Sequence, residues 1–379
     1  MKYVLAAGGT AGHINPALAI AEEIKNRDGR AEIAFVGRSD GMESRLVPKA
    51  GYRLIPVVAS GFTRGWSPRA LAENAEAVRK ALVSERQCRE FYREFRPDFV
   101  IGCGGYVSGP AVLTAAQMKI RTAIQEQNAF PGVTTRLLAK HVDLIFAPSE
   151  DAKERIGYPD KTYVVGTPIE DGFFTADREQ CRNELGVGDR TCILSFGGSN
   201  GSKTINELAV RIMAKTAGKG RTYHIHGMGI YWTEGFPKRL ADYGIPGDCP
   251  DIDCRVYIED MVRCMTAADL VIGRAGANTI CEIAASGKAS ILIPSPNVTE
   301  NHQYYNAMIL GSLGAAIVCE EKDLDLDSLA DRAVELINDP ARIRAMGEKA
   351  RAAAHRNCAG EICSRIYENA GVDPGASDV

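Results

Sequence analysis

The sequence contains no hydrophobic run long enough to cross a membrane, because no stretch approaches the roughly 18 apolar residues that a span requires. The apolar start, residues 3–7, runs directly into Gly8 and Gly9 and is too short for a secretory signal peptide. The eleven cysteines are an odd number and are scattered, without zinc-finger spacing. These absences exclude a disulfide framework and predict reduced thiols in a cytosolic protein, several of them in the core.

The sequence also lacks a convincing metal-binding motif. The pairs Asp251/Asp253 and Asp323/Asp325 have the Asp-x-Asp spacing, but neither directly follows a strong apolar strand. We expect the first pair in a loop and the second at the start of a charged helix, as solvated and capping residues. No metal and no cofactor are therefore expected.

The length and composition are those of a globular protein with two domains. The chain has 379 residues, of which 45% are hydrophobic and 25% are charged. The net charge of −3 divides unequally, since residues 1–166 hold 23 Lys/Arg against 18 Asp/Glu and the remainder holds 22 against 30. The two halves are thus expected to meet different surroundings, but nucleic acid is not expected as a partner.

Short apolar runs alternate with helical segments along the chain, which is typical of doubly wound parallel sheets. The expected strands of the first half are 2–7, 31–36, 99–102, 122–124, 144–146 and 163–165. The expected strands of the second half are 192–196, 222–226, 256–258, 270–272 and 290–293. Helices are expected at 17–25, at 71–82, from about 203 and at 340–370. A hinge at 166–168 separates a domain of residues 1–166 from one of residues 167–354, and residues 371–379 are expected to form a disordered tail.

A glycine-rich turn follows the first expected strand of each half. The segment 8–13 lacks the G-x-G-x-x-G dinucleotide pattern, but His13 lies where a strand ends and a helix begins, which favours a functional histidine over a capping or buried one. The segment 197–204 departs from a P-loop because Ser202 separates Gly201 from Lys203. It still predicts an anion cradle to which Ser199 and Asn200 add donors, or else a tight turn.

The stretch from Asp269 to Glu282 predicts a phosphate site. An apolar strand, 270–272, leads through Gly273 and Gly276 into a helix that opens at Ala277. The first N–H groups of a helix have no intrahelical partner and attract phosphate. Glu282, one turn further on, is placed to bind a ribose, so the stretch predicts a nucleotide diphosphate.

Three polar loops follow other apolar runs, at 104–109, 126–128 and 295–303. Ligands of open α/β sheets bind at the carboxyl ends of the strands. Two such sheets facing an interdomain cleft predict a site for two substrates. The alternative for the loop 295–303 is a purely structural polar loop.

In order and spacing these motifs resemble the MurG family, whose members add N-acetylglucosamine to lipid I. The matching segments are 8–16, 104–110, 126–132, 134–140, 197–201, 257–261, 274–282 and 297–303. The resemblance implies a GT-B glycosyltransferase fold of two Rossmann-like, doubly wound domains. It also implies that the last helix, about 355–370, packs back on the first domain.

The resemblance places the donor, UDP-N-acetylglucosamine (UDP-GlcNAc), mainly on the second domain. Ile258 would meet the uracil through its backbone and Glu282 would take the ribose hydroxyls, while Gln303 and His302 read the sugar and Asn128 reaches across from the first domain. The implied donor set is Thr10, Gly12, Asn128, Ser199, Asn200, Ile258, Met261, Arg274, Ala277, Asn278, Thr279, Glu282, His302 and Gln303.

The acceptor side falls on the first domain. The resemblance makes His13 the general base towards the C4 hydroxyl of lipid I, with Glu126 in support and Tyr106 and Asn128 as further acceptor contacts. It implies a single inverting displacement that gives lipid II. A base at the acceptor and a preorganised anion site at the leaving group are what this chemistry needs.

The sequence departs from the family pattern in two places. Thr167 and Glu170 stand where the family often has Asn and Arg, and an acid there would repel a diphosphate unless it points away. The helix 71–82 matches the family's membrane-docking region but carries Glu73 and Glu76. Nearby basic residues, including Arg64, together with Phe62 and Trp66, favour peripheral binding to an anionic membrane at its cytoplasmic face.

Two alternatives remain open. One is a GT-B transferase of another nucleotide sugar that acts on a different lipid or on a secondary metabolite, because the fold alone does not separate these activities. The other is a non-catalytic nucleotide-sugar-binding protein, against which His13 argues.

Overall fold

A computed structural model describes residues 1–61 and 67–372. The chain divides into two compact units, unit 1 (Met1–Ile169 with Asn357–Val379) and unit 2 (Glu170–Arg356). The expectations for Phe62, Arg64 and Trp66, and for the tail from residue 373 onwards, lie outside the described residues.

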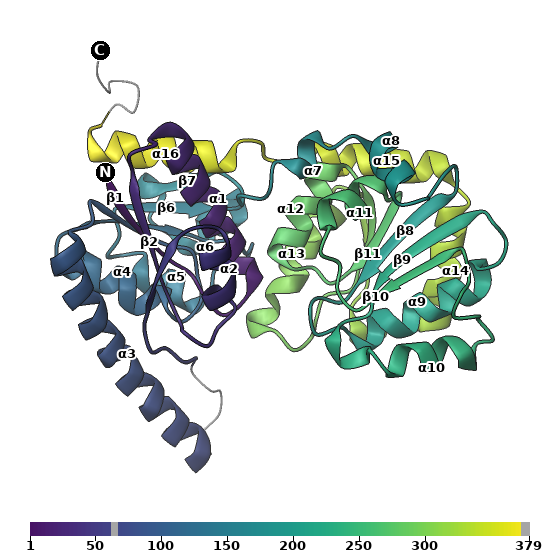
Figure 1. Cartoon of the computed structure of the whole chain (residues 1–379), viewed down its shortest axis with the longest axis horizontal. Helices are drawn as coiled ribbons and strands as arrows, with labels where there is room; N and C mark the ends of the chain where they lie inside the picture. The colour runs from purple at the N-terminus through teal and green to yellow at the C-terminus, as the bar shows by residue number, and fades with distance from the viewer. Residues whose placement is uncertain (62–66, 373–379) are drawn as a thin grey trace. The chain divides into compact units, whose positions relative to one another are not determined.

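Unit 1 is built on a seven-stranded parallel sheet of order β3-β2-β1-β4-β5-β6-β7 (Figure 1). Its strands are β1 (Lys2–Ala6), β2 (Glu32–Gly37), β3 (Arg53–Pro56), β4 (Phe99–Gly102), β5 (Arg121–Gln125), β6 (Leu144–Ala147) and β7 (Thr162–Val164). Its helices are α1 (Ala11–Arg27), α2 (Glu43–Lys49), α3 (Pro68–Phe95), α4 (Ser108–Gln117), α5 (Val133–Leu138), α6 (Glu150–Ile156) and α16 (Cys358–Ala370).

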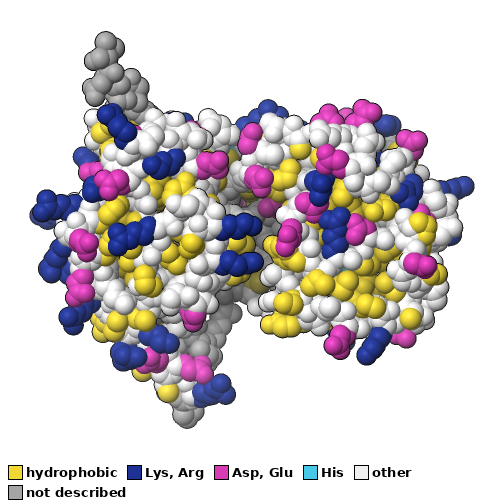
Figure 2. All heavy atoms as spheres, in the orientation of Figure 1, with side chains coloured by type: hydrophobic (Ala, Val, Ile, Leu, Met, Phe, Trp, Pro, Cys, Tyr) yellow, Lys and Arg dark blue, Asp and Glu magenta, His cyan; other side chains and the backbone are white. Residues whose placement is uncertain are grey.

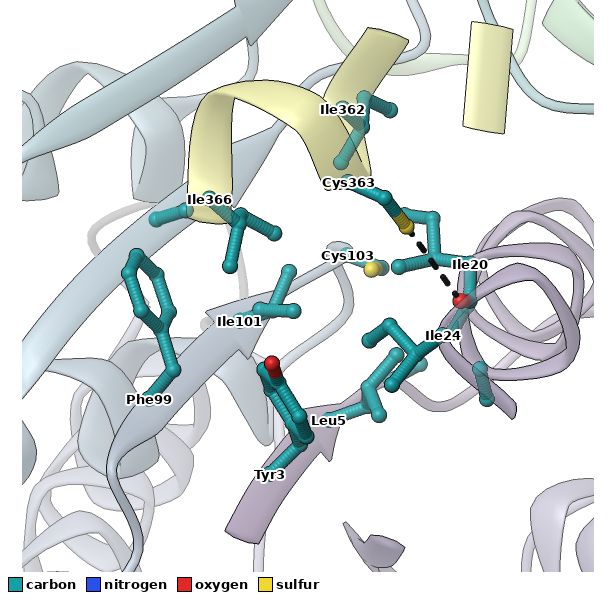
Figure 3. Packing of buried hydrophobic residues seen from close by; sticks show 14 of the residues in the cluster. Tyr3, Leu5, Ile20, Ile24, Phe99, Ile101, Cys103, Ile362, Cys363 and Ile366 are labelled. Atoms are coloured by element: carbon teal, nitrogen blue, oxygen red, sulfur yellow. Dashed lines mark hydrogen bonds between the residues drawn. The ribbon is translucent and has the colours of Figure 1, made fainter. Parts of the chain in front are cut away.

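Both faces of this sheet are buried, which explains why its strands are continuous apolar runs. Tyr3 and Leu5 of β1 contribute to one core, whereas Val4 and Ala6 contribute to a second core on the other face. The first core also takes in α1 and α16 (Figure 3), where the Cys363 thiol lies 3.9 Å from the carbonyl oxygen of Ile20. The last helix of the chain is therefore part of unit 1.

Two helices of unit 1 are longer than the sequence indicated. Helix α1 begins at Ala11 and not at 17, because Thr10 is extended and ends the turn early. Pro16 lies inside the helix, where its missing N–H removes only one backbone hydrogen bond. Helix α3 extends from Pro68 to Phe95, well beyond the expected 71–82. The consequence for the site is that His13 lies in the first turn of a helix and not in a loop.

Unit 2 is built on a six-stranded parallel sheet of order β10-β9-β8-β11-β12-β13. Its strands are β8 (Thr191–Phe196), β9 (Thr222–Gly227), β10 (Ile252–Arg255), β11 (Leu270–Gly273), β12 (Ala289–Leu292) and β13 (Ala316–Val318). Its helices are α7 (Gly172–Thr175), α8 (Arg178–Glu184), α9 (Lys203–Thr216), α10 (Gly235–Asp242), α11 (Met261–Ala267), α12 (Ala277–Ser286), α13 (His302–Gly311), α14 (Leu326–Ile337) and α15 (Pro340–Ala352).

The expected strand at 256–258 is wrong, because the strand is β10 and ends at Arg255. This correction changes the reading of the first Asp-x-Asp pair. Asp253 lies in β10 and pairs with Arg255, and Asp251 is buried, where it accepts hydrogen bonds from Arg190 and from the N–H of Gly220. Asp325 caps α14, as expected. Within residues 1–61 and 67–372, no group of three or more His, Cys, Asp or Glu could hold a metal ion.

The two doubly wound sheets confirm the predicted fold class, and the cleft between the domains stays a prediction. All eleven cysteines are free and eight of them are buried, as expected of core thiols. None of the helices in the described ranges is both long and apolar enough to span a membrane.

The two sheets share a topology in which the strand order changes direction at one point in each sheet. The chain runs from the first strand outwards through two neighbours and then returns to the other side of the first strand. The direction therefore switches between β1 and β4 in unit 1, and between β8 and β11 in unit 2. Open α/β sheets bind their ligands at such switch points, beyond the carboxyl ends of the strands.

Candidate active site

The predicted residues of unit 1 gather at its switch point. Thr10, Gly12 and His13 follow β1, Tyr106 follows β4, and the pair Glu126 and Asn128 follows β5. These three strands are neighbours in the sheet, so their carboxyl ends lie side by side. Tyr106 is largely exposed at this edge and its ring lies against Gly61, where a Cβ atom would lie 2.4 Å from the ring.

The imidazole of His13 is held from two sides. Its Nδ1 lies 3.0 Å from Oε1 of Gln127, a buried residue that the sequence analysis did not single out. Gly104 lies against the same nitrogen, and a Cβ atom there would be 2.4 Å from it. Because Gly104 has a φ of +97°, both its space and its backbone conformation require glycine.

Glu126 is committed to its own loop and makes no hydrogen bond to His13. One carboxylate oxygen accepts from the N–H groups of Gln127 and Asn128 and from the Asn128 side chain, at 2.9 to 3.1 Å. The other accepts from the N–H of Gly132 at 3.0 Å and from the Thr135 hydroxyl at 2.5 Å. This carboxylate organises the loop from β5 to α5, and Gln127 is the residue that contacts the histidine.

A second carboxylate, Glu43, lies inside the glycine-rich turn of unit 1. It is fully buried and accepts from the N–H of Gly9 at 3.1 Å and from the N–H of Arg38 at 2.9 Å. A Cβ atom on Gly8 would lie 2.5 Å from its oxygen. The turn therefore already contains an acidic side chain of the protein, which the sequence analysis missed because Glu43 lies 34 residues from Gly9.

The predicted residues of unit 2 gather at the corresponding switch point. The loop 197–201 follows β8, the turn to α12 follows β11, and His302 and Gln303 follow β12. No hydrogen bond joins the N–H groups of Gly198, Ser199 or Asn200 to another described residue. The helix α12 begins at Ala277 after Gly276 without a side-chain cap, so the N–H groups of Ala277, Asn278 and Thr279 are also open. Two sets of backbone donors therefore meet between β8 and β11, where they suit an anion.

Arg274 contacts this loop but is already paired. Its guanidinium forms an ion pair with Glu321 and donates to the Ser202 hydroxyl at 2.7 Å. It also donates to the carbonyl oxygens of Ile293 and Pro294, at 3.0 and 3.2 Å. Glu321 in turn accepts from the Thr204 hydroxyl at 2.5 Å. Arg274 thus fastens the start of α9 to the ends of β12 and β13, and Glu321 is a third residue that the sequence analysis missed.

Glu282 lies in the second turn of α12, where its environment disfavours the charge. Burial, and to a smaller extent the nearby carboxylate of Glu170, raises the pKa of Glu282 to about 7. The acid that departs from the family pattern at position 170 therefore acts on Glu282. Close by in the same helix, the side-chain oxygen of Asn278 is buried without a hydrogen-bond partner in the described residues.

The loop after β10 leaves its backbone open. Because the strand ends at Arg255, neither the N–H nor the carbonyl of Ile258 is hydrogen-bonded within the described part of the chain. The side chain of Ile258 is buried against Gly227 at the end of β9. Met261 follows as the first residue of α11. This geometry suits recognition of a nucleobase edge by the backbone.

The loop before α13 is tied to the rest of the site. The side-chain oxygen of Gln303 accepts from the N–H of Ser295 at 2.9 Å, and Asn306 donates to the carbonyl oxygen of Ala275 at 3.2 Å. Glu300 and Asn301, just before His302, both have a φ of +52°. Non-glycine residues with positive φ are strained and concentrate at functional sites.

Comparisons with known proteins match both halves of the chain. The family model described as the glycosyltransferase family 28 N-terminal domain matches residues 3–147, and the C-terminal domain of that family matches residues 192–362. A UDP-N-acetylglucosamine–N-acetylmuramyl-(pentapeptide) pyrophosphoryl-undecaprenol N-acetylglucosamine transferase of Acetivibrio thermocellus is 38% identical over 369 residues, which cover 97% of each chain. A protein of the same name from Caldanaerobacter subterraneus subsp. tengcongensis is 37% identical over 363 residues, 96% of this chain and 98% of that one.

A solved structure extends the agreement to three dimensions. The crystal structure of MurG from Acinetobacter baumannii matches with a TM-score of 0.74 at 25% identity, over 97% of this chain and 99% of that one. On these matches, the chain belongs to glycosyltransferase family 28 and, within it, to the MurG family.

Proposed function

We propose that this protein transfers N-acetylglucosamine from UDP-GlcNAc to the C4 hydroxyl of the N-acetylmuramyl sugar of lipid I, giving lipid II. The observation that carries the proposal is the histidine of unit 1, His13, which lies at the switch point of its sheet with one ring nitrogen fixed by Gln127. A general base in such a place serves an acceptor hydroxyl. The two relatives described above are named as N-acetylglucosamine transferases of N-acetylmuramyl-(pentapeptide) pyrophosphoryl-undecaprenol.

Unit 2 supplies the donor site in this proposal. The diphosphate lies on the open N–H groups of the loop 197–201 and of the start of α12. The backbone of Ile258 takes the uracil, Glu282 takes the ribose hydroxyls, and the loop of His302 and Gln303 reads the sugar. Ribose hydroxyls are donors, so their binding favours the ionised form of Glu282 and offsets the effect of Glu170 on its pKa.

The chemistry is a single displacement with inversion. The acceptor oxygen attacks the anomeric carbon, the bond to UDP breaks with its electron pair, and His13 takes the hydroxyl proton. Backbone donors aimed at the leaving diphosphate stabilise the charge that develops there. This scheme requires no metal ion to stabilise the charge on the leaving diphosphate, because the backbone N–H groups of the α12 start and of the glycine-rich loop do so.

The test is turnover of UDP-GlcNAc with a lipid I analogue, with and without a chelator, in the wild type and in His13→Ala. We expect wild-type turnover that resists the chelator, and a fall of about 100-fold or more in His13→Ala with unchanged UDP affinity. Transfer to another acceptor but not to lipid I would favour the alternative transferase. Binding of UDP-GlcNAc without transfer to any acceptor would favour the non-catalytic alternative.

We further propose that unit 1 binds the anionic cytoplasmic face of the cell membrane through α3. Leu71, Val78 and Leu82 are 52%, 49% and 62% exposed, and their spacing of seven and four residues places them on one face of the helix. The N-terminal half of α3 extends beyond the neighbouring elements of unit 1 (Figure 1). An exposed apolar stripe on a projecting helix is typical of peripheral membrane attachment.

The charges on α3 are mixed, as Figure 2 shows, and they pair along the helix. Arg69 pairs with Glu73, Arg79 with Glu76 and Arg86 with Glu90, all at the surface. Exposed pairs contribute little to stability, so these arginines are free to exchange a carboxylate for a lipid phosphate.

Vesicle flotation tests this attachment. We expect binding to anionic vesicles that weakens with salt and that decreases in Leu82→Gln. The matched control is Leu313→Gln, which changes an exposed leucine of unit 2 and leaves binding unchanged. Binding that is insensitive to salt, or no binding to anionic vesicles, would contradict the proposal.

A further inference from the structure

The contact between His13 and Gln127 joins two distant parts of unit 1. His13 lies in the first turn of α1, and Gln127 lies in the loop between β5 and α5, 114 residues away. The Nδ1 and Oε1 atoms are 3.0 Å apart, and Gln127 is buried. The contact is therefore made inside the protein and not across solvent.

The orientation of the Gln127 amide follows from its other neighbours. Its Nε2 faces the carbonyl oxygen of Cys103 at 2.8 Å, the carbonyl oxygen of Gln125 at 3.3 Å and the side-chain oxygen of Gln125. Backbone carbonyls only accept, so the atom that faces them is the NH₂ group. The side chain of Gln125 is itself oriented, since its Nε2 donates to the carbonyl oxygen of Glu126 at 3.0 Å. The atom of Gln127 that faces His13 is consequently the oxygen.

An amide oxygen cannot donate a hydrogen bond, so the hydrogen between the two groups belongs to Nδ1 of His13. A neutral imidazole carries one hydrogen, and the nitrogen that lacks it carries the lone pair. The partner of one ring nitrogen thus decides which nitrogen is basic. With Nδ1 protonated, the basic nitrogen is Nε2.

We propose that Gln127 is a positioning residue that holds His13 in the Nδ1–H tautomer and so reserves Nε2 as the general base. The inference rests on the proposed function for the role of that base, while the tautomer itself can be observed without turnover. In the reaction, the acceptor hydroxyl gives its proton to Nε2 as its oxygen bonds to the anomeric carbon. The bond from that carbon to the oxygen of UDP breaks and UDP takes the electron pair.

Gln127 suits both ends of this step. When His13 becomes imidazolium, both ring nitrogens carry hydrogen and Oε1 of Gln127 still accepts from Nδ1, so no hydrogen bond has to rearrange. Gly104 packs against the Nδ1 side of the ring and leaves no room there for a side chain. Glu126 is excluded from this role because its carboxylate is occupied by its own loop.

The tautomer is tested by two-bond ¹⁵N–¹H spectra of the full chain labelled at its six histidines, with His13 assigned from His13→Ala. We expect the wild type to show the Nδ1–H pattern for His13 at a pH at which the ring is neutral. In Gln127→Met, which keeps the length but removes the acceptor, we expect this pattern to weaken. In Gln127→Glu, which restores an acceptor, we expect it to return. An Nε2–H pattern in the wild type would overturn the inference whatever the activity.

Kinetics separate positioning from a purely structural role. In Gln127→Met, kcat is expected to fall about tenfold or more, with the KM for UDP-GlcNAc unchanged, because only the base is disturbed. In Gln127→Glu, the acidic limb of the pH profile of kcat/KM is expected to move to higher pH, because a carboxylate beside the ring favours the imidazolium. The control Gln117→Met changes an exposed glutamine of α4 and is expected to alter neither quantity.

The outcomes distinguish this inference from the proposed function. If the tautomer is as expected and His13→Ala still transfers sugar, the base role fails and the positioning contact stands. If Gln127→Met keeps both the Nδ1–H pattern and the wild-type kcat, the positioning role is wrong. If Gln127→Met does not fold, the wild-type spectrum and the pH profile of Gln127→Glu still decide.

Discussion

The glycine-rich loops of the two units share a frame but differ in charge. Each follows the first strand of its sheet. In each unit, the backbone of a glycine from a neighbouring loop, Gly105 or Gly229, lies in close contact with the backbone of this loop. A Cβ atom on Gly105 would lie 2.2 Å from the carbonyl oxygen of Gly8, and one on Gly229 would lie 2.1 Å from the nitrogen of Gly201. In unit 1, however, the carboxylate of Glu43 already occupies the N–H of Gly9. In unit 2, the N–H groups of residues 198–200 are not bonded to any described residue.

The difference teaches how one topology serves two tasks. The loop of unit 1 holds the side chain of Glu43 on the N–H of Gly9 and leads directly into α1, so it suits the placement of a side chain, here His13. A loop with open backbone donors suits an anionic ligand. Its nearby cation, Arg274, already forms an ion pair with Glu321.

The largest effect is expected where the two loops are alike. Gly105→Ala and Gly229→Ala each place a methyl group against backbone, at residues with φ of +78° and +85°. Each is expected to destabilise the protein by about 3 kcal/mol or more, since strain and overpacking add. Urea unfolding measures this loss of stability. If the loops have different tasks, Gly105→Ala lowers turnover in steady-state kinetics, whereas Gly229→Ala weakens UDP binding in calorimetry.

The controls for this pair are Gly157→Ala and Gly188→Ala. Both glycines have positive φ, but a Cβ atom on either would meet nothing within 4 Å. Only the backbone cost applies, about 1–3 kcal/mol, and Gly157 has a φ of 74° and a ψ of −169°, a conformation that is essentially confined to glycine. If the loop variants cost no more than these controls, the close approaches do not constrain the loops.

The second effect tests the internal anion of unit 1. Glu43→Gln replaces a carboxylate that accepts from two backbone N–H groups by an amide whose NH₂ group faces one of them. We expect a loss of about 1–3 kcal/mol, which is the cost of leaving one buried donor unsatisfied. Turnover is expected to fall while UDP affinity stays unchanged. The control Glu22→Gln alters an exposed residue of α1 and is expected neither to lower the stability nor to lower turnover. A drop in UDP affinity in Glu43→Gln would show that the loops are not separate.

The third effect concerns the pH dependence of unit 2. His224 and His226 are buried on either side of the Ser195 hydroxyl, each 2.7 Å from it. Burial lowers the pKa of His224 to about 3 and that of His226 well below its usual value. Unfolded histidines take protons near pH 6.5, so their contribution to stability is complete above that pH and is lost as the pH falls below it. The slope of the free energy of unfolding against pH reaches about 1.4 kcal/mol per pH unit for each histidine.

Glu282 acts in the opposite sense. Because its pKa is raised to about 7 in the folded protein, its contribution to the free energy of unfolding falls as the pH rises from about 4.5 to 7.

Urea unfolding between pH 7.5 and 5.5 checks this difference. A Trp66→Phe background leaves Trp232 as the fluorescent reporter in unit 2. His226→Leu is expected to reduce the slope, whereas His141→Gln, at an exposed position of unit 1, is expected to leave it unchanged. An unchanged slope in His226→Leu would show that the buried pair does not set the acid sensitivity of unit 2.

The sequence predicted the interior strands of both sheets well, but of the four edge strands it found only β7. β4, β6 and β11 are buried on both faces and form clear apolar runs. β3, β10 and β13 lie at sheet edges and were missed or misplaced, since a short, partly exposed strand carries little hydrophobic pattern. His13 and the start of α12 were found because each follows a strand and opens a helix.

Gln127, Glu43 and Glu321 were not found, because what they do depends on partners brought close only by folding. Their partners are 114, 34 and 47 residues away. Local sequence indicates that such residues are polar, but it does not indicate what they contact. The place of Arg274 in the implied donor set stays a prediction, and it leads to the last comparison.

The smallest expected effect concerns the role of Arg274 in unit 2. If Arg274 fastens the loop through Glu321, Arg274→Lys and Glu321→Gln each loosen the same contact. Each is then expected to raise the KM for UDP-GlcNAc by about fivefold, which corresponds to about 1 kcal/mol, with a double variant that is hardly worse than either. If Arg274 instead binds the diphosphate directly, Arg274→Lys is far more damaging than Glu321→Gln. Arg263→Lys serves as the control, because it changes an arginine that pairs with Asp260 and Glu184 at the surface of the same unit. Equal effects in the first two variants would leave the open backbone donors as the groups of unit 2 that meet the phosphates, and the contrast with the occupied loop of unit 1 would hold.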